Sequence, residues 1–322
     1  MTGGGEFGFI RTRLLPLTRG HRAALDLSDD AALLDPAPGC QIVVASDMLV
    51  AGVHFLETDP PEIAAERAVR SNLSDLAAMG AQPLGYLSSI AWPTGIEASW
   101  RDGFIAGLAA AQDTFGLSLL GGDTTSGPSP LTISLTMLGQ VPAGTALLRR
   151  GARPDDDVWV SGTIGDAWLG LAIARGDVAH NSVLLERYRR PIPRLELGIS
   201  LRGLASACLD ISDGLVADAG HIAEVSGVRL ELQADQIPFS PPARIWLASA
   251  PSDGLVRLVT GGDDYELLFC APSARRALIS GLGEHFDLTL TRIGTVTEGQ
   301  GGALIGPNGV VLETGAGGFT HF

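Results

Sequence analysis

The stretch LDISDGLVADAGHI, residues 209–222, indicates the fold of the second half of the chain. A short apolar run ends at Asp210, and Asp213 follows it after an Ile-Ser pair. Gly214 then opens a segment whose apolar residues recur at helical spacing, so the pattern is that of a strand leading into a helix. Two carboxylates this close repel each other, and burying them costs more still. The stretch therefore predicts that a positively charged group binds where the strand gives way to the helix.

Length and composition describe an ordinary globular protein. The chain has 322 residues, of which 45% are hydrophobic and 18% charged, enough for two domains with cores of their own. No apolar run approaches the ~18 residues of a membrane span, and the N-terminus lacks the apolar segment of a signal peptide. The three cysteines, Cys40, Cys208 and Cys270, are too dispersed for a disulfide framework or a cysteine zinc site. We therefore expect a cytoplasmic enzyme with no membrane partner.

The charged residues narrow the function further. The net charge is −14, which argues against nucleic acid as a partner. All 22 basic residues are arginine, and the chain contains no lysine. The absence of lysine excludes both a Walker A phosphate loop and Schiff-base chemistry. Any phosphate that this chain handles must be bound by metal ions, arginine side chains and backbone N–H groups.

Gly and Pro residues divide the chain into segments that alternate between strand and helix patterns. The first half is predicted to contain strands at 41–49, 84–92, 117–125 and 131–141 and helices at 61–80 and 99–116. The second half is predicted to contain strands at 158–162 and within 261–271, and helices at 166–175 and from 196 toward 207. The polar connection 142–157, in which 155–157 form a solvated turn, separates domain 1–148 from domain 149–322. The chain is thus predicted to be an α/β (α+β) protein of two similar domains.

Acidic residues recur where apolar segments end. They are Asp29, Asp30, Asp47, Asp75, Asp123, Asp210, Asp213, Asp263 and Asp264, and several stand beside Gly or a hydroxyl residue. Mg²⁺ prefers a few carboxylates together with phosphate oxygens, and Gly lets phosphates approach backbone N–H groups. In a chain without lysine, this repeated pattern predicts a nucleotide site with several metal ions.

Each acid also has a local explanation, which remains open. Asp29 and Asp30 fit a helix N-cap. Asp123 and Asp263 fit turns after Gly pairs, and the 210–213 segment fits a helix start. Asp75 differs, because the macrodipole disfavours an acid near a helix C-terminus by ~0.3–1 kcal/mol. A bound cation would remove that cost.

Two other side chains are candidates for phosphate contacts. His54 follows the strand that carries Asp47, and it is either a partly buried loop histidine or a hydrogen-bond donor to phosphate. Arg149 lies at the predicted domain boundary, and it is either a surface charge beside Arg150 or a bridge to nucleotide phosphates across the cleft.

The motifs together resemble the thiamine-monophosphate kinase family along essentially the whole chain. They are GEF near the N-terminus, SDDAALL, ASDMLVAGVHF, NLSDLAAMGAQP, GGDTTSGP, LRRGARP, SGTIGDA, LDISDGL, GGDDYELLF and the C-terminal GGFTHF. This family belongs to a wider group that includes aminoimidazole ribonucleotide and selenophosphate synthetases. The resemblance implies an N-terminal sheet domain that forms a homodimer, a C-terminal α/β domain, and ATP bound in the cleft between them.

The resemblance also implies roles for single residues. The positions that would hold several Mg²⁺ ions are Asp30, Ser46, Asp47, Asp75, Asp123, Asp210 and Asp213. Those that would contact ATP are Gly122, Asp123, Arg149 and Ser212, and those that would contact the substrate are His54, Asp263 and Ala316. The chain departs from the family where Asp263 replaces a usual Glu and where Ala316 replaces a usual aromatic.

The implied reaction is direct, in-line transfer of the γ-phosphoryl group of ATP to thiamine monophosphate, giving thiamine diphosphate. The acceptor oxygen is already ionised near neutral pH, so we expect no covalent nucleophile and no general base. Two alternatives stay open: another ATP-dependent synthetase or kinase of the wider group, and a metal-dependent phosphohydrolase. An EF-hand calcium protein is excluded, because no such loop is present.

Overall fold

The structure is a computed structural model that describes residues 6–315, 317 and 318. Its contacts divide the chain into two units. The N-terminal unit comprises residues up to 76 together with 82–144, and the C-terminal unit comprises 77–81 together with the residues from 145 onward. The predicted boundary at 148/149 falls in the same connection. Among the described residues, no helix has the length and apolar character that crossing a membrane requires.

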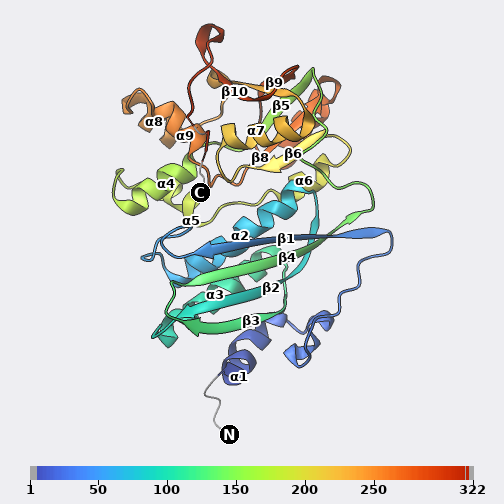
Figure 1. Ribbon diagram of the computed structural model, residues 1–322, viewed down its shortest axis with the longest axis vertical. Coiled ribbons are helices and arrows are strands. Elements are labelled where there is room, and N and C mark those ends of the chain that lie inside the picture. The colour runs from blue at the N-terminus through green and yellow to red at the C-terminus, as the bar shows by residue number, and fades with distance from the viewer. Residues whose placement is uncertain (1–5, 316, 319–322) are drawn as a thin grey trace. The chain divides into compact units, whose positions relative to one another are not determined.

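The N-terminal unit contains a four-stranded sheet in the order β1-β4-β2-β3 (Figure 1). Its strands are β1 (Cys40–Val50), β2 (Gln82–Pro93), β3 (Leu119–Gly127) and β4 (Thr132–Pro142). Its helices are α1 (Glu6–Phe9), α2 (Pro61–Ala78) and α3 (Ala98–Phe115), with short helical turns at Ile10–Leu14, Leu15–Thr18 and Arg22–Leu27. The pairs β1–β4 and β2–β4 are antiparallel, and β2–β3 is parallel. This confirms the predicted order of strands and helices in the first half.

Among the described residues of this unit, helices cover one face of the sheet. Tyr86 and Trp92 of β2 are buried, and the Trp92 ring meets Phe104 of α3 edge to face at 5.5 Å between centroids. Side chains alternate along a strand, so residues of the other parity lie on the opposite face. There Val44 and Met48 of β1 are 60% and 57% exposed. The sheet therefore presents an apolar face that the helices of its own unit do not cover.

The C-terminal unit contains a six-stranded sheet in the order β10-β7-β9-β5-β8-β6. Its strands are β5 (Asp156–Ser161), β6 (Ala207–Asp210), β7 (Arg229–Gln233), β8 (Leu267–Pro272), β9 (Leu290–Thr297) and β10 (Gly301–Ile305). Its helices are α4 (Asp166–Arg175), α5 (Ser182–Arg189), α6 (Leu195–Leu201), α7 (Leu215–Ser226), α8 (Pro241–Ser249), α9 (Gly254–Thr260) and α10 (Arg276–His285), with short turns at Ala234–Gln236, Ser273–Arg275 and Pro307–Gly309.

Both faces of this second sheet are buried. Val158 of β5 belongs to a core cluster with Ile222 of α7, whereas its neighbour Trp159 belongs to another cluster with Leu201 of α6. Strands covered on both faces read as continuous apolar runs, which is how VWV at 158–160 reads in the sequence. Cys208 and Cys270 are buried in this unit.

The structure corrects three details of the sequence prediction. The helix expected from 196 toward 207 ends at Leu201. The strand expected within 261–271 begins only at Leu267. The solvated turn predicted at 155–157 is wrong for Asp156 and Asp157, which are buried at the start of β5. Hydrogen bonds and two arginines make this burial tolerable, and the sequence pattern did not reveal these distant partners.

Candidate functional site

The N-terminal unit brings Asp47 and Asp75 together. Asn72 and Asp75 lie three residues apart on α2, on one face of the helix. The Asn72 side-chain oxygen accepts the backbone N–H of Asp47 at 3.0 Å, and Asp75 lies close enough to Asp47 to affect the pKa of that carboxyl group. Partial desolvation raises the pKa of Asp47, against the lowering effects of Asp75 and the nearby His54. The side chains of Asp47, Asp75 and His54 therefore lie near one another beside β1.

His54 is fixed in one orientation by its own loop and by a buried arginine. Its Nδ1 accepts the backbone N–H of Val50 at 3.0 Å, so this nitrogen carries no proton in the neutral ring. The proton is then on Nε2, which is the nitrogen that can donate. Arg67 of α2 is 2% exposed and donates its Nε–H to the backbone oxygen of His54 at 3.0 Å. The predicted phosphate donor is therefore pre-oriented.

Gly122 and Asp123 lie on the edge strand β3. Cross-strand pairing places Asp47, Leu135, Ser88 and Gly122 in one row across the sheet. Gly122 has φ 147°, and a Cβ there would overlap the backbone oxygen of Ser88, so only glycine fits. Asp123 is exposed, and one of its carboxylate oxygens accepts the N–H of Thr124 at 2.8 Å.

Ser46 and Asp30 have less defined surroundings. The Ser46 hydroxyl is within 3.1 Å of the Leu135 backbone oxygen and 3.0 Å of the Thr136 hydroxyl. Asp30 is exposed in the irregular segment before β1, where no helix begins, so it caps none. The metal roles of both residues stay predictions.

In the C-terminal unit, Asp210 ends β6 and Asp213 stands just before α7, as the strand-to-helix pattern predicted. Asp210 is 5% exposed and Asp213 is half-buried. A third acid, Asp218, lies one turn into α7 and is 2% exposed. One of its oxygens accepts the backbone N–H groups of residues 212, 213 and 214, each at 3.1 Å. The segment that carries the predicted ligands is therefore anchored on an internal carboxylate.

These acids alter one another's electrostatics. Burial, and then the charges of Asp210 and Asp213, raise the pKa of Asp218 to about 7. His221 lies one turn further along α7, and potential ligand atoms of Asp213, Asp218 and His221 lie within 4.8 Å of one another. Asp218 and His221 were not among the site residues predicted from the sequence. The sequence does contain a pattern that could have identified them, because an acid and a histidine follow Asp213 at helical spacing. The prediction used only the apolar residues of the same helix.

The segment around Asp263 is hydrogen-bonded directly to the segment around Ser212. Asp263 N–H donates to the Ser212 backbone oxygen, and Tyr265 N–H donates to the Ile211 backbone oxygen, both at 2.8 Å. A Cβ on Gly262 would overlap that same Ser212 oxygen. Asp263 and Tyr265 adopt left-handed φ values of 66° and 52°. Such strain in a bulky residue persists only where the surroundings impose it, and it is typical of functional segments.

Asp264 and Glu266 alternate with these two residues in the sequence, and their buried contacts hold the segment in this conformation. Asp264 is buried and accepts the Gly165 N–H at 2.9 Å. Glu266 is fully buried, and Arg187 and Arg194 donate to it at 2.5–2.6 Å. Burial would raise the pKa of Glu266, but the two guanidinium groups prevail and hold it below its usual range. Asp264 was among the acids predicted for the nucleotide site, whereas no role was predicted for Glu266.

A groove of about 720 Å³ adjoins α7. Asp213, His221 and Glu224 line it, together with residues 300–302 of the β10 region and with described residues near the end of the chain. Ala316, predicted to contact the substrate, lies outside the described residues. Arg149 is exposed in the connection beside β6, where Leu148 O accepts the N–H of Cys208 at 2.8 Å.

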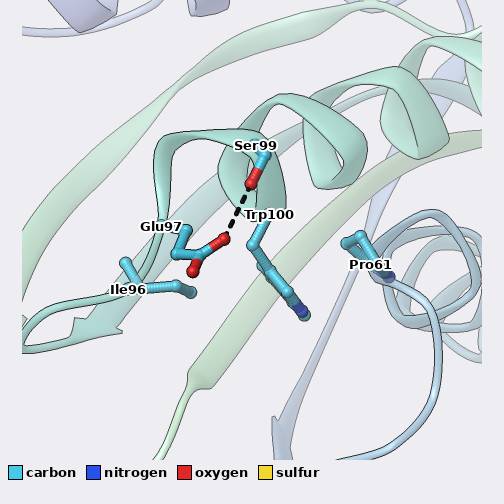
Figure 2. A pocket seen from close by; sticks show the side chains of 5 residues that line it. All are labelled: Pro61, Ile96, Glu97, Ser99 and Trp100. Carbon is cyan, nitrogen blue, oxygen red and sulfur yellow. Dashed lines mark hydrogen bonds between the residues drawn. The ribbon is translucent and has the colours of Figure 1, made fainter.

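A smaller cavity of about 330 Å³ lies in the N-terminal unit, at the start of α2 (Figure 2). Trp100 and Pro61 line it, with Ile96 and with Glu97, which accepts a hydrogen bond from Ser99 at 3.2 Å. Pro61 begins α2, whereas Asp75 lies fourteen residues later, about 21 Å along the helix axis. This cavity is therefore separate from the Asp47–Asp75 cluster.

Comparisons with known proteins agree with the residue pattern. The family model of the AIR synthase related protein N-terminal domain matches residues 28–141, and that of its C-terminal domain matches residues 153–306. A thiamine-monophosphate kinase from Caulobacter vibrioides is 44% identical over 92% of this chain and 85% of that protein.

Solved structures give the same result. The crystal structure of thiamine-monophosphate kinase from Stenotrophomonas maltophilia K279a is 41% identical, with a TM-score of 0.80 over 89% of this chain and 91% of that one. AaThiL complexed with AMPPCP and TMP is 30% identical, with a TM-score of 0.77 over 99% of this chain and 97% of that one.

Proposed function

The chain belongs to the thiamine-monophosphate kinase family of AIR synthase related proteins, and we propose that it transfers the γ-phosphoryl group of ATP to thiamine monophosphate. The single observation that carries this proposal is near-full-length similarity to AaThiL, whose structure contains AMPPCP and TMP. An ATP analogue and thiamine monophosphate occupying one protein identify the two substrates of such a transfer. ATP is accordingly the co-substrate, and thiamine diphosphate is the product.

The donor set of both units fits magnesium. The N-terminal unit offers Asp47 and Asp75, and the C-terminal unit offers Asp210 and Asp213, all with the hard oxygen ligands that Mg²⁺ prefers. The raised pKa of Asp47 indicates that its carboxylate would gain from a nearby cation. When bound, Mg²⁺ neutralises the charge of the phosphate oxygens and holds them in place. Asp30, Ser46 and Asp123 are the remaining proposed ligands.

The side chains of the chain itself position the reactants. His54, with its proton on Nε2, is suited to donate a hydrogen bond to the substrate phosphate. Arg149 and Ser212 are proposed to bind ATP phosphates, and Gly122 lets the nucleotide approach the backbone of β3. Asp263 is held in a fixed backbone conformation for substrate contact. Phosphoryl transfer requires mainly this positioning and charge stabilisation, so no covalent nucleophile is needed.

The test is to incubate the protein with ATP, Mg²⁺ and a panel of phosphate acceptors, and to separate the products by chromatography. We expect thiamine diphosphate and ADP in equal amounts, formed only when thiamine monophosphate is present. Release of inorganic phosphate without an acceptor would indicate the phosphohydrolase alternative instead. A diphosphate product from another acceptor would indicate another enzyme of the wider group.

The homodimer is proposed from the uncovered face of the N-terminal sheet. Ile42, Val44 and Met48 are exposed on this face, where Leu87 and Leu138 are half-buried. An exposed apolar surface of this extent is typical of a protein interface. Replacing Val44 and Met48 with Asp should convert a dimer into monomers in sedimentation experiments. A wild-type protein that sediments as a monomer would contradict the proposal. The cytoplasmic location stays a prediction.

A further inference from the structure

Asp218 occupies a position that, in many nucleotide enzymes, is open to phosphate. Backbone N–H groups at the start of a helix, after a strand and a Gly turn, bind anions readily. Here the three N–H groups of residues 212–214 donate instead to the Asp218 carboxylate, which comes from the same helix. Phosphate in this segment must therefore be bound by side chains and by the cations that the neighbouring acids hold.

We propose that Asp218 is a positioning residue that fixes the backbone of residues 212–214 so that the side chains of Asp210, Ser212 and Asp213 can bind metal and nucleotide. The proposal rests on the proposed function for the identity of the ligands. Its geometric support is three hydrogen bonds of 3.1 Å to one carboxylate oxygen of Asp218, a residue that is 2% exposed. Partners of metal ligands that act through hydrogen bonds typically change metal affinity or activity by about 10- to 100-fold.

Backbone hydrogen bonds and the buried Ile211 side chain hold the first part of this segment. Ile211 N–H donates to the Glu266 backbone oxygen at 2.8 Å, and the Ser212 and Ile211 oxygens accept from Asp263 and Tyr265. These bonds fix the segment up to Ser212. Beyond that point Gly214, at φ 132°, gives the chain an unusual conformation that its own steric preferences do not select. Asp218 supplies the constraint for this second part of the segment.

The experiment compares two alanine variants and two asparagine variants. Asp156 is a matched control, because it is 5% exposed, caps a turn through the Arg153 N–H at 3.0 Å and accepts a hydrogen bond from Ser206. It pairs with Pro272 at one end of β8, whereas Asp210 pairs with Leu267 at the other end. Asp218→Ala should raise the Mg²⁺ concentration for half-maximal rate about 10- to 100-fold. Asp156→Ala should change it by no more than about twofold, although both variants lower Tm.

The variant Asp218→Asn distinguishes the effect of losing the hydrogen-bond acceptor from the effect of losing the negative charge. Asparagine keeps an oxygen that can accept the three N–H groups but removes the charge, so it should recover most of the lost Mg²⁺ affinity. Asp156→Asn is its control. If Asp218→Asn were as impaired as Asp218→Ala, or if Asp218→Ala matched Asp156→Ala, the positioning role would be wrong.

A second readout does not depend on turnover. Mn²⁺ binding to each folded variant, with a non-hydrolysable ATP analogue present, is measured by electron paramagnetic resonance. Asp218→Ala should bind Mn²⁺ about 10-fold more weakly than wild type, and Asp156→Ala should bind it normally. If wild type formed no thiamine diphosphate, the proposed function would fail, yet the Mn²⁺ titrations would still decide the role of Asp218.

Discussion

The C-terminal unit holds two sets of buried or half-buried carboxylates in different electrostatic surroundings. Asp157 and Glu266 are held by arginines: Arg276 donates to Asp157 at 2.6 Å, and Arg194 donates to Glu266 at 2.5 and 2.6 Å. Asp210, Asp213 and Asp218 instead lie near one another at the start of α7. The pKa of Glu266 is held below its usual range, whereas burial and the neighbouring acids raise the pKa of Asp218.

This difference distinguishes acids that stabilise the fold from acids that prepare a site. A carboxylate neutralised by arginine within the protein has little remaining attraction for a cation. Carboxylates placed beside like charges lose stability in the absence of a ligand, and such groups are typical of functional sites. The two sets should therefore respond oppositely to substitution.

The largest expected effect is on turnover. Asp210→Asn removes one of the clustered charges, and we expect kcat to fall by about 100- to 1000-fold because the charge that stabilises the phosphoryl oxygens is lost. If Asp210→Asn kept full activity at limiting Mg²⁺, Asp210 would not be a metal ligand, and the proposed difference between the two sets of acids would be wrong.

The next effect is on stability. Glu266→Ala leaves Arg187 and Arg194 without the carboxylate between them, and breaking a buried ion pair typically costs about 3–5 kcal/mol. We expect the free energy of unfolding in urea to fall by this amount. Arg190, whose partner Glu186 is exposed, provides a control: Glu186→Ala should cost less than about 1 kcal/mol. Equal losses would show that burial does not distinguish the two pairs.

The pH dependence of stability tests the acids that are paired with arginine. Burial would raise the pKa of Asp157, but Arg276 and Arg292 prevail and lower it. The Asp157 carboxyl therefore binds a proton less tightly in the folded state than in the unfolded state. Its contribution to stability is fully present above the unfolded pKa of about 4 and is lost as the pH falls through the lower pKa of the folded state. Asp157→Asn should cost about 2 kcal/mol at pH 7. Chemical unfolding should show this difference shrinking below about pH 4. A pH-independent difference would contradict it.

The smallest effect concerns substrate contact. Asp263→Glu restores the residue usual in the family, and the longer side chain should lower KM for thiamine monophosphate by about 5- to 10-fold. Asp tolerates the left-handed φ of 66° better than Glu, so Tm should fall slightly. Steady-state kinetics with each substrate varied in turn would test this. A change in KM for ATP alone would place Asp263 with the nucleotide.

Much of the fold was predictable because local patterns and tertiary structure agree. The strand at 41–49 and the helix at 61–80 were predicted from apolar spacing and from a first-turn proline, and they appear as β1 and α2. The strand-to-helix step at Asp210 was predicted in the same way. The predictions that failed concern segments whose state depends on distant partners, such as Asp157 with Arg276, or the 263–266 segment with Ile211 and Ser212.

By itself, the sequence determined the classes of chemistry open to this protein. A chain without lysine and with acids at strand ends cannot use a Walker loop, and its motifs identify its family. The three-dimensional arrangement was needed to show that Asp218 accepts the N–H groups of residues 212–214, that His54 Nδ1 accepts a backbone N–H, and which acids are paired with arginine. The physical reason is that residue type fixes what a side chain can donate or accept, whereas its charge state and orientation depend on neighbours that lie far away in the sequence.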